Sequence, residues 1–477
     1  MTDRTVTRPV PLRLRLPLWL MSIAALLVLW PVSARALVEI AKPGVIILHH
    51  MPNPVYFDAA TTPAFEAMVT AYRREVVNMV GMGATAVALD AFNNNRDRGR
   101  LAAWKEAVRQ HNAEKNQRFC FYLIADFDPN VWPAEVIRST YRSLVDSPYY
   151  CSIRQKPVLS TYHGEQASAA WHQANVLDAL RSTGQEPFYL VFYRTKGTDE
   201  IIRDYFDVWR RAGYDVGFYR FSGNRPQGLL NGAKLEKPKY DAAGYVYVPG
   251  FGTSYWAHCS ARGNAGTYLE HDGFEGLELL WKSVSPGGVI AGDYVILTSW
   301  NDHGEDNFTH PLAQTFYFYL TPDLHLWTHR GFYEFQRHAS RWFRRQQPVA
   351  GDWVYWAYRQ HRKDLAPPAG DECVEHRNTL SFQGDVQDSI YVTTVLAAPG
   401  ELQVTFGGSS FVYARPAGVS HVRIPWRSDR GRPRFVLNRA GSQVMAKTGT
   451  LAVTDTPIGR DGQGTRNFNH YADFMRR

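Results

Sequence analysis

Eight short apolar runs alternate with longer amphipathic segments between Val45 and Trp300, and this alternation constrains the fold most strongly. Such a pattern is typical of β-strands followed by helices around a parallel sheet. The runs occupy residues 45–50, 85–90, 118–127, 157–162, 187–193, 216–221, 243–248 and 293–300. Eight strands with helices over roughly 250 residues match the size of a (β/α)8 TIM-type barrel. A doubly wound sheet is the main alternative, but no Gly-rich phosphate loop follows the first run, which disfavours a dinucleotide fold.

The segments between the runs carry helix start and stop signals. PAFEAMVTAYRREVVNMVG has Pro63 near its start and Gly81 at its end. TDEIIRDYFDVWRRAG has Thr198 in the N-cap position and Gly213 as its stop. Proline at a helix start and glycine at its end are the expected punctuation. A last amphipathic helix, GFYEFQRHASRWFRRQ, closes this part of the chain.

A second kind of pattern follows the linker-like stretch DLAPPAGDE at 364–372. Short β-prone runs separated by Gly and Pro turns predict a C-terminal antiparallel β-sandwich. We therefore expect a (β/α)8 domain at 37–365 and a β-sandwich accessory domain at 366–477. The apolar alternation in WVYWAY, residues 353–358, suits an interdomain contact that braces the barrel. Ligand binding by the sandwich is the alternative.

The N-terminus resembles a secretory signal peptide, predicted at residues 1–36. Arg4, Arg8, Arg13 and Arg15 precede the apolar run LPLWLMSIAALLVLW, and SARA offers small residues before a cut at Leu37. The run is shorter than the ~20 residues of a membrane span, although an uncleaved anchor is the alternative. We expect a secreted or periplasmic protein with no stable membrane span after cleavage.

The net charge of +8 owes much to this N-terminal region. Removal of residues 1–36 leaves 48 basic and 44 acidic residues, a net charge of +4. No dense Lys/Arg block with interleaved aromatic residues is present, so we expect no nucleic-acid partner.

Four cysteines, Cys120, Cys151, Cys259 and Cys373, are widely spaced and form no CxxC motif. A zinc knuckle is therefore disfavoured, whereas an oxidising compartment would allow one or two disulfides. The sequence does not fix their pairing. A buried free thiol is an equal alternative for Cys120, which lies inside the apolar stretch RFCFYLI.

Polar and aromatic residues follow the predicted strands at the end where a (β/α)8 barrel carries its site. These candidate binding residues are His49, His50, Asp90, Asp126, Asp128, Tyr162, His163, Glu165, Tyr247, Trp300 and Asn301. The chain has no HExxH motif, which leaves a metal hydrolase as a minor alternative. It also has no GxSxG nucleophile elbow. We expect no metal or other cofactor.

The stretch LTSWNDHGED, residues 297–306, places three acidic residues, Asp302, Glu305 and Asp306, at the end of the eighth strand. Asp302 and Glu305 are three residues apart, with Gly304 between them supplying turn freedom. Glycoside hydrolysis needs one carboxylic acid to protonate the leaving oxygen and one carboxylate to activate water or attack the sugar. Aromatic residues crowd the same strand ends, and sugar rings stack on aromatic planes.

Several candidates have a second interpretation. His49 and His50 either form a hydrogen-bonded pair at the barrel mouth or contact sugar. Asp126 and Asp128 follow the same strand, and one of them is expected to face the barrel axis while the other would cap the next helix. Asp90 either contacts the ligand or accepts hydrogen bonds from an Asn-rich turn.

Three stretches resemble motifs of glycoside hydrolase family 71, the α-1,3-glucanases or mutanases. They are KPVLSTYHGE, VILTSWNDHGED and DWVYWAYRQHRKD, and the resemblance runs from about Val45 to Val453. Members of that family are inverting enzymes with a (β/α)8 catalytic domain and a β-sandwich, which implies that Asp302 and Glu305 are the catalytic pair. By similarity to glycoside hydrolase family 99, the endo-α-mannosidases, Glu305 is assigned as general acid and Asp302 as general base.

The chain departs from the family pattern at two places. His163 stands in STYHG where the family carries Glu in STFEG, and Glu165 lies two positions later. Asp306, Asn307 and Phe308 replace the family's SHY. These departures put the exact glucan and linkage in doubt more than the fold.

The resemblance implies an enzyme that hydrolyses α-1,3-glucan, and we expect a monomer. An endo-acting hydrolase of another α-linked polysaccharide, such as a mannan or a bacterial exopolysaccharide, is the first alternative. A carbohydrate-binding protein that has lost turnover is the second.

Overall fold

The computed structural model describes most of the chain from Leu37 onward. The described residues are 37–40, 43–52, 64–91, 94–126, 133–221, 225–257, 267–269, 271–301, 309–311, 328–367, 381–383, 386–426, 430–456, 468 and 470–477. The predicted signal peptide at 1–36, and also Cys259 and Cys373, lie outside these residues and stay predictions.

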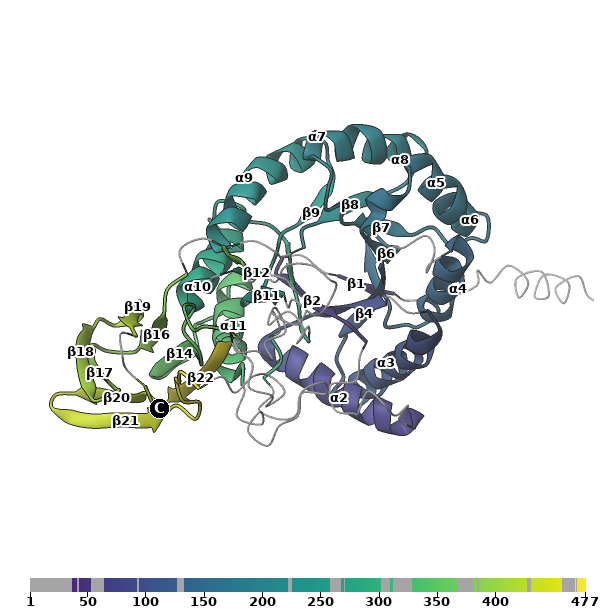
Figure 1. Ribbon diagram of the computed structural model, residues 1–477. Coiled ribbons are helices and arrows are strands. Elements are labelled where there is room, and N and C mark those ends of the chain that lie inside the picture. The colour runs from purple at the N-terminus through teal and green to yellow at the C-terminus, as the bar shows by residue number, and fades with distance from the viewer. Residues whose placement is uncertain are drawn as a thin grey trace, which may run out of the picture. The chain divides into compact units, whose positions relative to one another are not determined.

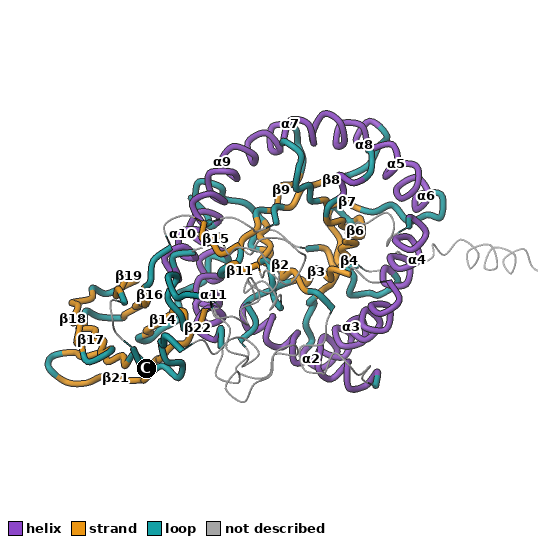
Figure 2. The backbone as a smooth tube through the Cα atoms, in the orientation of Figure 1, coloured by secondary structure: helices purple, strands orange, loops and turns teal. Residues whose placement is uncertain are grey.

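The apolar runs form the parallel barrel that the sequence predicts (Figures 1 and 2). In barrel order the strands are β2 (Val45–His50), β3 (Ala86–Ala91), β4 (Cys120–Asp126), β6 (Lys156–Tyr162), β7 (Phe188–Val191), β8 (Val216–Tyr219), β9 (Val246–Val248) continuing as β10 (Gly250–Phe251), and β13 (Tyr294–Leu297). β9 pairs with β8, β10 pairs with β13, and β13 pairs with β2, all in parallel. The broken strand β9–β10 therefore closes the barrel.

The closure depends on a glycine. Arg220 donates its backbone N–H to the Val248 carbonyl at 2.8 Å, and Ile296 donates to the Pro249 carbonyl at 2.9 Å. A Cβ atom on Gly250 would lie 1.7 Å from the Arg220 carbonyl oxygen. Only a residue without a side chain fits this approach of two backbones.

Helices surround the barrel in an outer ring (Figure 1). They are α2 (Phe65–Met82), α3 (Asn94–Lys115), α4 (Ala134–Val145), α5 (Ala169–His172), α6 (Asp178–Arg181), α7 (Thr198–Ile201), α8 (Asp207–Arg211), α9 (Pro226–Ala242), α10 (Gly273–Val284) and α11 (Arg330–Phe343), with π-helical turns at Gln173–Leu177 and Ile202–Phe206. Among the helices described, none combines the length and the apolar character that a membrane crossing requires.

Two predicted helix boundaries shift. α2 runs through Gly81 and ends at Met82, because Gly83 has φ +105° and donates its N–H to the Val80 carbonyl at 2.9 Å. The left-handed conformation of this closing residue favours glycine. Thr198 is the first helical residue, and Gly197 occupies the N-cap position instead. Gly213, with φ +86°, follows α8 as the predicted stop.

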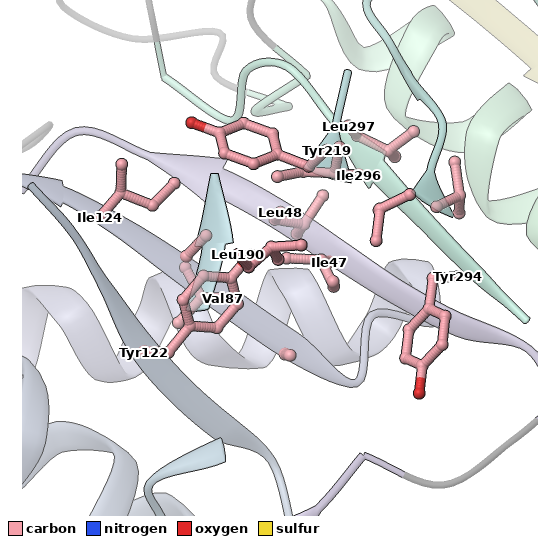
Figure 3. Packing of buried hydrophobic residues seen from close by; sticks show 14 of the residues in the cluster. Ile47, Leu48, Val87, Tyr122, Ile124, Leu190, Tyr219, Tyr294, Ile296 and Leu297 are labelled. Carbon is pink, nitrogen blue, oxygen red and sulfur yellow. The ribbon is translucent and has the colours of Figure 1, made fainter. Parts of the chain in front are cut away.

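The barrel interior is filled by buried side chains from neighbouring strands. Figure 3 shows Ile47, Tyr122, Ile124, Leu190 and Ile296 gathered in this core, and each is fully buried. Close packing of this kind makes the centre a core and leaves the strand ends to carry chemistry.

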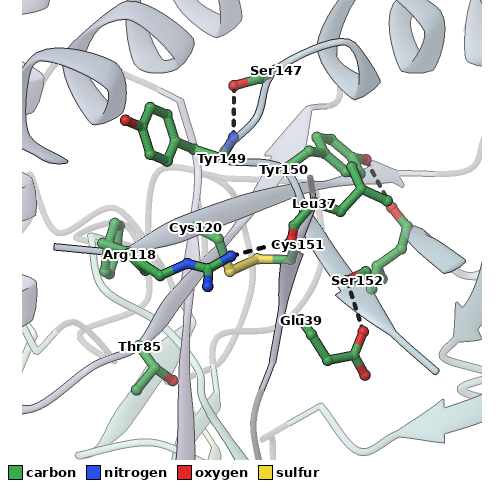
Figure 4. Close-up of a disulfide and its surroundings, with 12 residues drawn as sticks. Leu37, Glu39, Thr85, Arg118, Cys120, Ser147, Tyr149, Tyr150, Cys151 and Ser152 are labelled. Atoms are coloured by element: carbon green, nitrogen blue, oxygen red, sulfur yellow. Dashed lines mark hydrogen bonds between the residues drawn. A yellow bond between two sulfur atoms is a disulfide. The ribbon is translucent and has the colours of Figure 1, made fainter. Parts of the chain in front are cut away.

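A disulfide joins Cys120 at the start of β4 to Cys151 at the start of β5 (Cys151–Ile153), as Figure 4 shows. β5 also pairs with β1 (Val38–Glu39), so the bond lies at the amino-terminal end of the barrel strands. The two Cα atoms are 5.2 Å apart, within the usual range for a disulfide. Cys120 is therefore bonded, and the alternative of a free thiol at this position is wrong.

Replacing both cysteines with alanine is expected to lower the free energy of unfolding by roughly 3 to 4 kcal/mol, because the bond closes a loop with a sequence separation of 31. A urea titration of the Cys120→Ala/Cys151→Ala variant measures this loss. Catalytic turnover at the opposite end of the barrel should not change. An unaltered urea midpoint would contradict the expectation.

Two four-stranded antiparallel sheets form the C-terminal sandwich that the sequence predicts. One contains β14 (Trp353–Arg359), β16 (Ser389–Leu396), β19 (Gly418–Pro425) and β22 (His470–Arg476); the other contains β17 (Gly400–Phe406), β18 (Ser409–Arg415), β20 (Arg434–Arg439) and β21 (Ser442–Thr448). A small third sheet joins β11 (Tyr255–Ala257), β12 (Thr267–Leu269) and β15 (Ser381–Gln383).

Strand β14 contributes to two hydrophobic cores. Its side chains alternate, so that successive residues face opposite sides of the sheet. Trp353, Tyr355 and Ala357 pack with the barrel and its helices, whereas Val354, Trp356 and Tyr358 pack inside the sandwich. β14 lies before the predicted boundary at 365/366, and the boundary itself stays a prediction.

Candidate active site

A buried imidazole–carboxylate pair joins the carboxyl ends of β2 and β3. His49 Nε2 lies 2.7 Å from Asp90 Oδ2, and both side chains are buried. None of the described residues forms a hydrogen bond with His49 Nδ1 or Asp90 Oδ1. The pair therefore retains polar atoms that could serve a ligand.

Aromatic rings extend this pair across the barrel mouth. The Phe221 ring lies 5.3 Å from the His49 ring and 4.9 Å from the Tyr162 ring, measured between centroids. Tyr162 in turn stacks on Phe192 at 5.2 Å. His49 and Tyr162 lie at the carboxyl ends of β2 and β6, and Phe192 and Phe221 follow β7 and β8. One aromatic surface therefore spans the carboxyl ends of four strands.

Tyr219 lies close enough to Asp90 and Asp126 for both carboxylates to act on its phenol. Burial raises the pKa of the Tyr219 phenol well above its ordinary value, and the carboxylates of Asp90 and Asp126 add to that shift. Asp126 is the last residue of β4 and pairs in register with Tyr162 of β6. The structure thus brings Asp126, Asp90 and Tyr162 together, and their role in ligand binding stays a prediction. Asp128 lies outside the described residues.

The Glu165 carboxylate is hydrogen-bonded to backbone N–H groups of the loop after β7. Its Oε1 atom accepts hydrogen bonds from the N–H groups of Arg194 at 2.9 Å and Thr195 at 3.2 Å. His163 precedes it in a left-handed conformation with φ 56°, and the His163 ring lies 4.0 Å from that of Tyr162. His163 therefore lies beside the aromatic surface at the barrel mouth, whereas Glu165 holds the loop after β7 in place.

Two predicted binding residues lie on the outer side of the barrel strands. His50 is fully buried, with its ring 4.7 Å from Trp104 of α3 and 6.3 Å from Tyr72 of α2. The Tyr247 hydroxyl donates to Glu236 of α9 at 2.9 Å. The structure does not bring these two side chains together with His49 and Asp90.

Asn301 ties the end of β13 to the end of β2. Its Oδ1 accepts the backbone N–H of Met51 at 3.0 Å, and its Nδ2 donates to the Met51 carbonyl at 2.8 Å. Trp300 donates its own backbone N–H to the His49 carbonyl at 2.7 Å. Both residues therefore hold the two strand ends in place, and the Trp300 ring is fully buried.

A buried carboxyl group that the sequence did not indicate lies beside Trp300. The indole Nε1 of Trp300 donates to Glu75 Oε2 on α2, and His310 Nε2 lies 3.5 Å from the same oxygen. Burial raises the pKa of Glu75 to about 8, and burial lowers the pKa of His310 to about 3. Both groups are therefore neutral at neutral pH, and their contact is not an ion pair.

The two predicted catalytic carboxylates, Asp302 and Glu305, lie outside the described residues. The residues that flank them are described. Thr309 donates its backbone N–H to the Ser299 carbonyl at 3.0 Å, and His310 donates to the Trp300 carbonyl at 2.9 Å. The described flanks Trp300 and Thr309 therefore both lie beside the carboxyl end of β13.

No group of three or more His, Cys, Asp or Glu side chains suited to a metal ion occurs within the described ranges. The His49–Asp90 pair and the rings beside it offer hydrogen bonding and stacking. These interactions suit a ring-shaped ligand that has polar groups at its edge and apolar faces.

Residues 256–476 match the family model described as glycosyl hydrolase family 71. The range includes the segment 302–308 and the C-terminal sandwich. The resemblance predicted from the motifs is thereby confirmed over these residues, and the match supports a glycoside hydrolase. A search of curated proteins found no match.

Solved structures give weaker likenesses. The chain is similar to the GH99 endo-alpha-mannosidase from Bacteroides thetaiotaomicron, with 14% identity and a TM-score of 0.44 over 64% of this chain and 99% of that one. It is also similar to a beta-glucuronidase from Bacteroides uniformis, with 11% identity and a TM-score of 0.43 over 87% of this chain and 46% of that one. The chain spans about half the length of that second protein, and TM-scores of this size are too low to argue from.

Proposed function

Because residues 256–476 match glycosyl hydrolase family 71, we propose that this protein is a glycoside hydrolase that cleaves α-1,3-glucosidic bonds in α-1,3-glucan with inversion. Asp302 acts as general base and Glu305 as general acid. The protein acts as a monomer in the periplasm or outside the cell, and it needs no cofactor.

The observation that carries this proposal is the position of Trp300 and Asn301, which directly precede Asp302 in the sequence. Trp300 and Asn301 follow β13, the eighth barrel strand, and hydrogen bonds tie them to the end of β2 beside the His49–Asp90 pair. Catalytic residues of such barrels come from the carboxyl ends of the strands. The Cys120–Cys151 disulfide supports an oxidising compartment.

The proposed reaction divides its work between the two carboxyl groups. Protonated Glu305 donates a proton to the glycosidic oxygen as the bond to the anomeric carbon breaks. Asp302 takes a proton from a water molecule, which attacks that carbon from the opposite face. The product then carries the inverted anomeric configuration, and the two carboxyl groups exchange their protonation states.

The His49–Asp90 pair is proposed to hold sugar hydroxyl groups, while Tyr162, Phe192 and Phe221 contact the sugar faces.

Replacing Asp90 with alanine should lower kcat/KM by roughly 10- to 100-fold, since a hydrogen bond to a charged group contributes about 1.5 to 3 kcal/mol. Initial-rate kinetics measure the loss. Asp199→Ala, at a surface aspartate with a side chain 76% exposed, is the matched control and should not change kcat/KM. Equal kinetics for both variants would contradict the role of Asp90.

Incubation of the protein lacking residues 1–36 with insoluble α-1,3-glucan tests the function. Proton NMR should show release of soluble products whose new reducing ends are first of the β configuration. Products that are first of the α configuration would overturn inversion. An absence of products from α-1,3-glucan would overturn the substrate.

A parallel panel of α-linked polysaccharides separates the alternatives. Products from an α-mannan or a bacterial exopolysaccharide, without products from α-1,3-glucan, would favour a hydrolase of another glycan. Binding to insoluble glucan with no new reducing ends from any member of the panel would favour a carbohydrate-binding protein that lacks turnover.

A further inference from the structure

Glu75 contacts residues on both sides of the segment 302–308. Trp300 lies two positions before that segment, and its indole N–H donates to Glu75 Oε2. His310 lies two positions after the segment, and its Nε2 atom is 3.5 Å from the same oxygen. One side chain of α2 therefore meets both flanks of a stretch that is separated from it by more than two hundred residues.

The rest of this cluster is closely packed. The Trp300 and His310 rings meet edge to face with centroids 5.0 Å apart, and the Tyr333 ring of α11 lies 6.3 Å from that of Trp300. The Gln336 amide of α11 donates to Thr309 Oγ1 at 2.9 Å. α2 and α11 thus hold the two flanks from neighbouring sides of the barrel.

We propose that Glu75 is a positioning residue, which fixes Trp300 and His310 and thereby sets the placement of the segment that carries Asp302 and Glu305. This inference rests on the proposed function for its catalytic consequence. Glu75 itself does not touch the substrate. Catalytic groups must be held within a fraction of an ångström, so a shifted segment would lower turnover.

The protonation state of Glu75 makes the arrangement testable without substrate. Its pKa is raised to about 8 by burial, against an ordinary value of 4.5. Between these values the folded protein holds a proton that the unfolded chain has lost. The stability that Glu75 contributes is therefore complete below pH 4.5 and is lost as the pH rises through 8.

Neighbouring titratable groups do not obscure this window. His310, with a pKa lowered to about 3 by burial and further by the neighbouring His50 of β2, affects stability on the acidic side of neutrality. Burial raises the pKa of Tyr333 to about 12. A fall in melting temperature between pH 6.5 and 8.5 therefore reports on Glu75 within this cluster.

The first experiment compares melting temperatures of the protein lacking residues 1–36 with those of two variants across this pH range. Glu75→Gln keeps an oxygen for the Trp300 N–H and cannot ionise. Glu66→Gln is the matched control, because Glu66 lies in the exposed first turn of the same helix. The unsubstituted protein and the control should lose a few degrees between pH 6.5 and 8.5, whereas Glu75→Gln should not. Parallel curves for all three proteins would overturn the assignment of a buried neutral acid.

The second experiment measures kcat and KM on the glycan that the unsubstituted enzyme cleaves. Glu75→Leu preserves the volume but removes the acceptor of the Trp300 N–H, so kcat should fall by about tenfold or more with KM little changed. Glu75→Gln should restore most of kcat. Wild-type kcat in Glu75→Leu would overturn the positioning role.

A substitution of the hydrogen-bond donor, Trp300, keeps the proposal testable if Glu75→Leu does not fold. Trp300→Phe removes the N–H donor and keeps an aromatic ring, and it should reproduce the kcat loss of Glu75→Leu. If Glu75→Leu does not fold, a wild-type kcat in Trp300→Phe overturns the proposal. Absence of glycosidase activity in the unsubstituted protein refutes the proposed function instead, while the melting curves still decide the state of Glu75.

Discussion

Replacing Asp302 with asparagine or Glu305 with glutamine is expected to lower kcat on α-1,3-glucan by roughly 10²- to 10⁴-fold in each case. Each change keeps the size of the side chain and removes its ability to exchange a proton. The melting temperature should stay nearly constant, because neither substitution alters volume. Asp306→Asn makes the same charge change on the same segment and is the control, with a much smaller loss of kcat.

The two roles are separated by a substrate whose leaving group needs no proton. α-Glucosyl fluoride should restore much of the turnover of Glu305→Gln, since fluoride departs without general acid catalysis. It should not restore Asp302→Asn, which lacks the base for water. The opposite pattern would exchange the roles, and full activity of either variant on glucan would remove that residue from the mechanism.

Replacing Gly250 with alanine is expected to lower the free energy of unfolding by about 4 kcal/mol or more, or to prevent folding. The new Cβ would lie 1.7 Å from the Arg220 carbonyl oxygen, which is backbone and cannot rotate away. Relief of that overlap requires the junction between β8 and the broken strand β9–β10 to open. Denaturation in urea, together with the soluble yield, measures the effect.

Gly99→Ala is the matched control for this substitution. Gly99 lies in α3, and no heavy atom is within 4 Å of the position that its Cβ would take. Alanine in a helix interior is favoured over glycine by about 1 kcal/mol, so this variant should be unchanged or slightly more stable. Equal urea midpoints for Gly250→Ala and the unsubstituted protein would contradict the closure by backbone contact.

The barrel was predictable because buried parallel strands appear as continuous apolar runs. All eight runs contain a barrel strand. Helix ends were less certain, because Gly81 and Gly83 look alike in sequence and only the backbone geometry distinguishes them. The sandwich strands β21 and β22 carry a weak strand signal in the sequence, since β21 has mixed polar residues and β22 joins its sheet through long-range pairing with β14.

The mouth of the barrel was predictable in part. Consecutive residues at a strand end face opposite sides, and this alternation alone is enough to separate His49 from His50. The same rule places Tyr219 inside and Phe218, which stacks on Tyr240 of α9, outside. Glu75 had no such signal, because a glutamate after two arginines in an amphipathic helix looks solvent-exposed. Its burial depends on Trp300, far away in the chain.

The two faces of β14 limit how the barrel and the sandwich can be separated or exchanged. Its odd-numbered aromatic residues belong to one core and its even-numbered ones to the other, so no cut on either side of the strand leaves both cores complete. Exchange of the sandwich for an unrelated module would expose Trp353 and Tyr355 or leave a gap beneath α11. Barrel and sandwich are therefore expected to melt in one cooperative transition and to be inherited together.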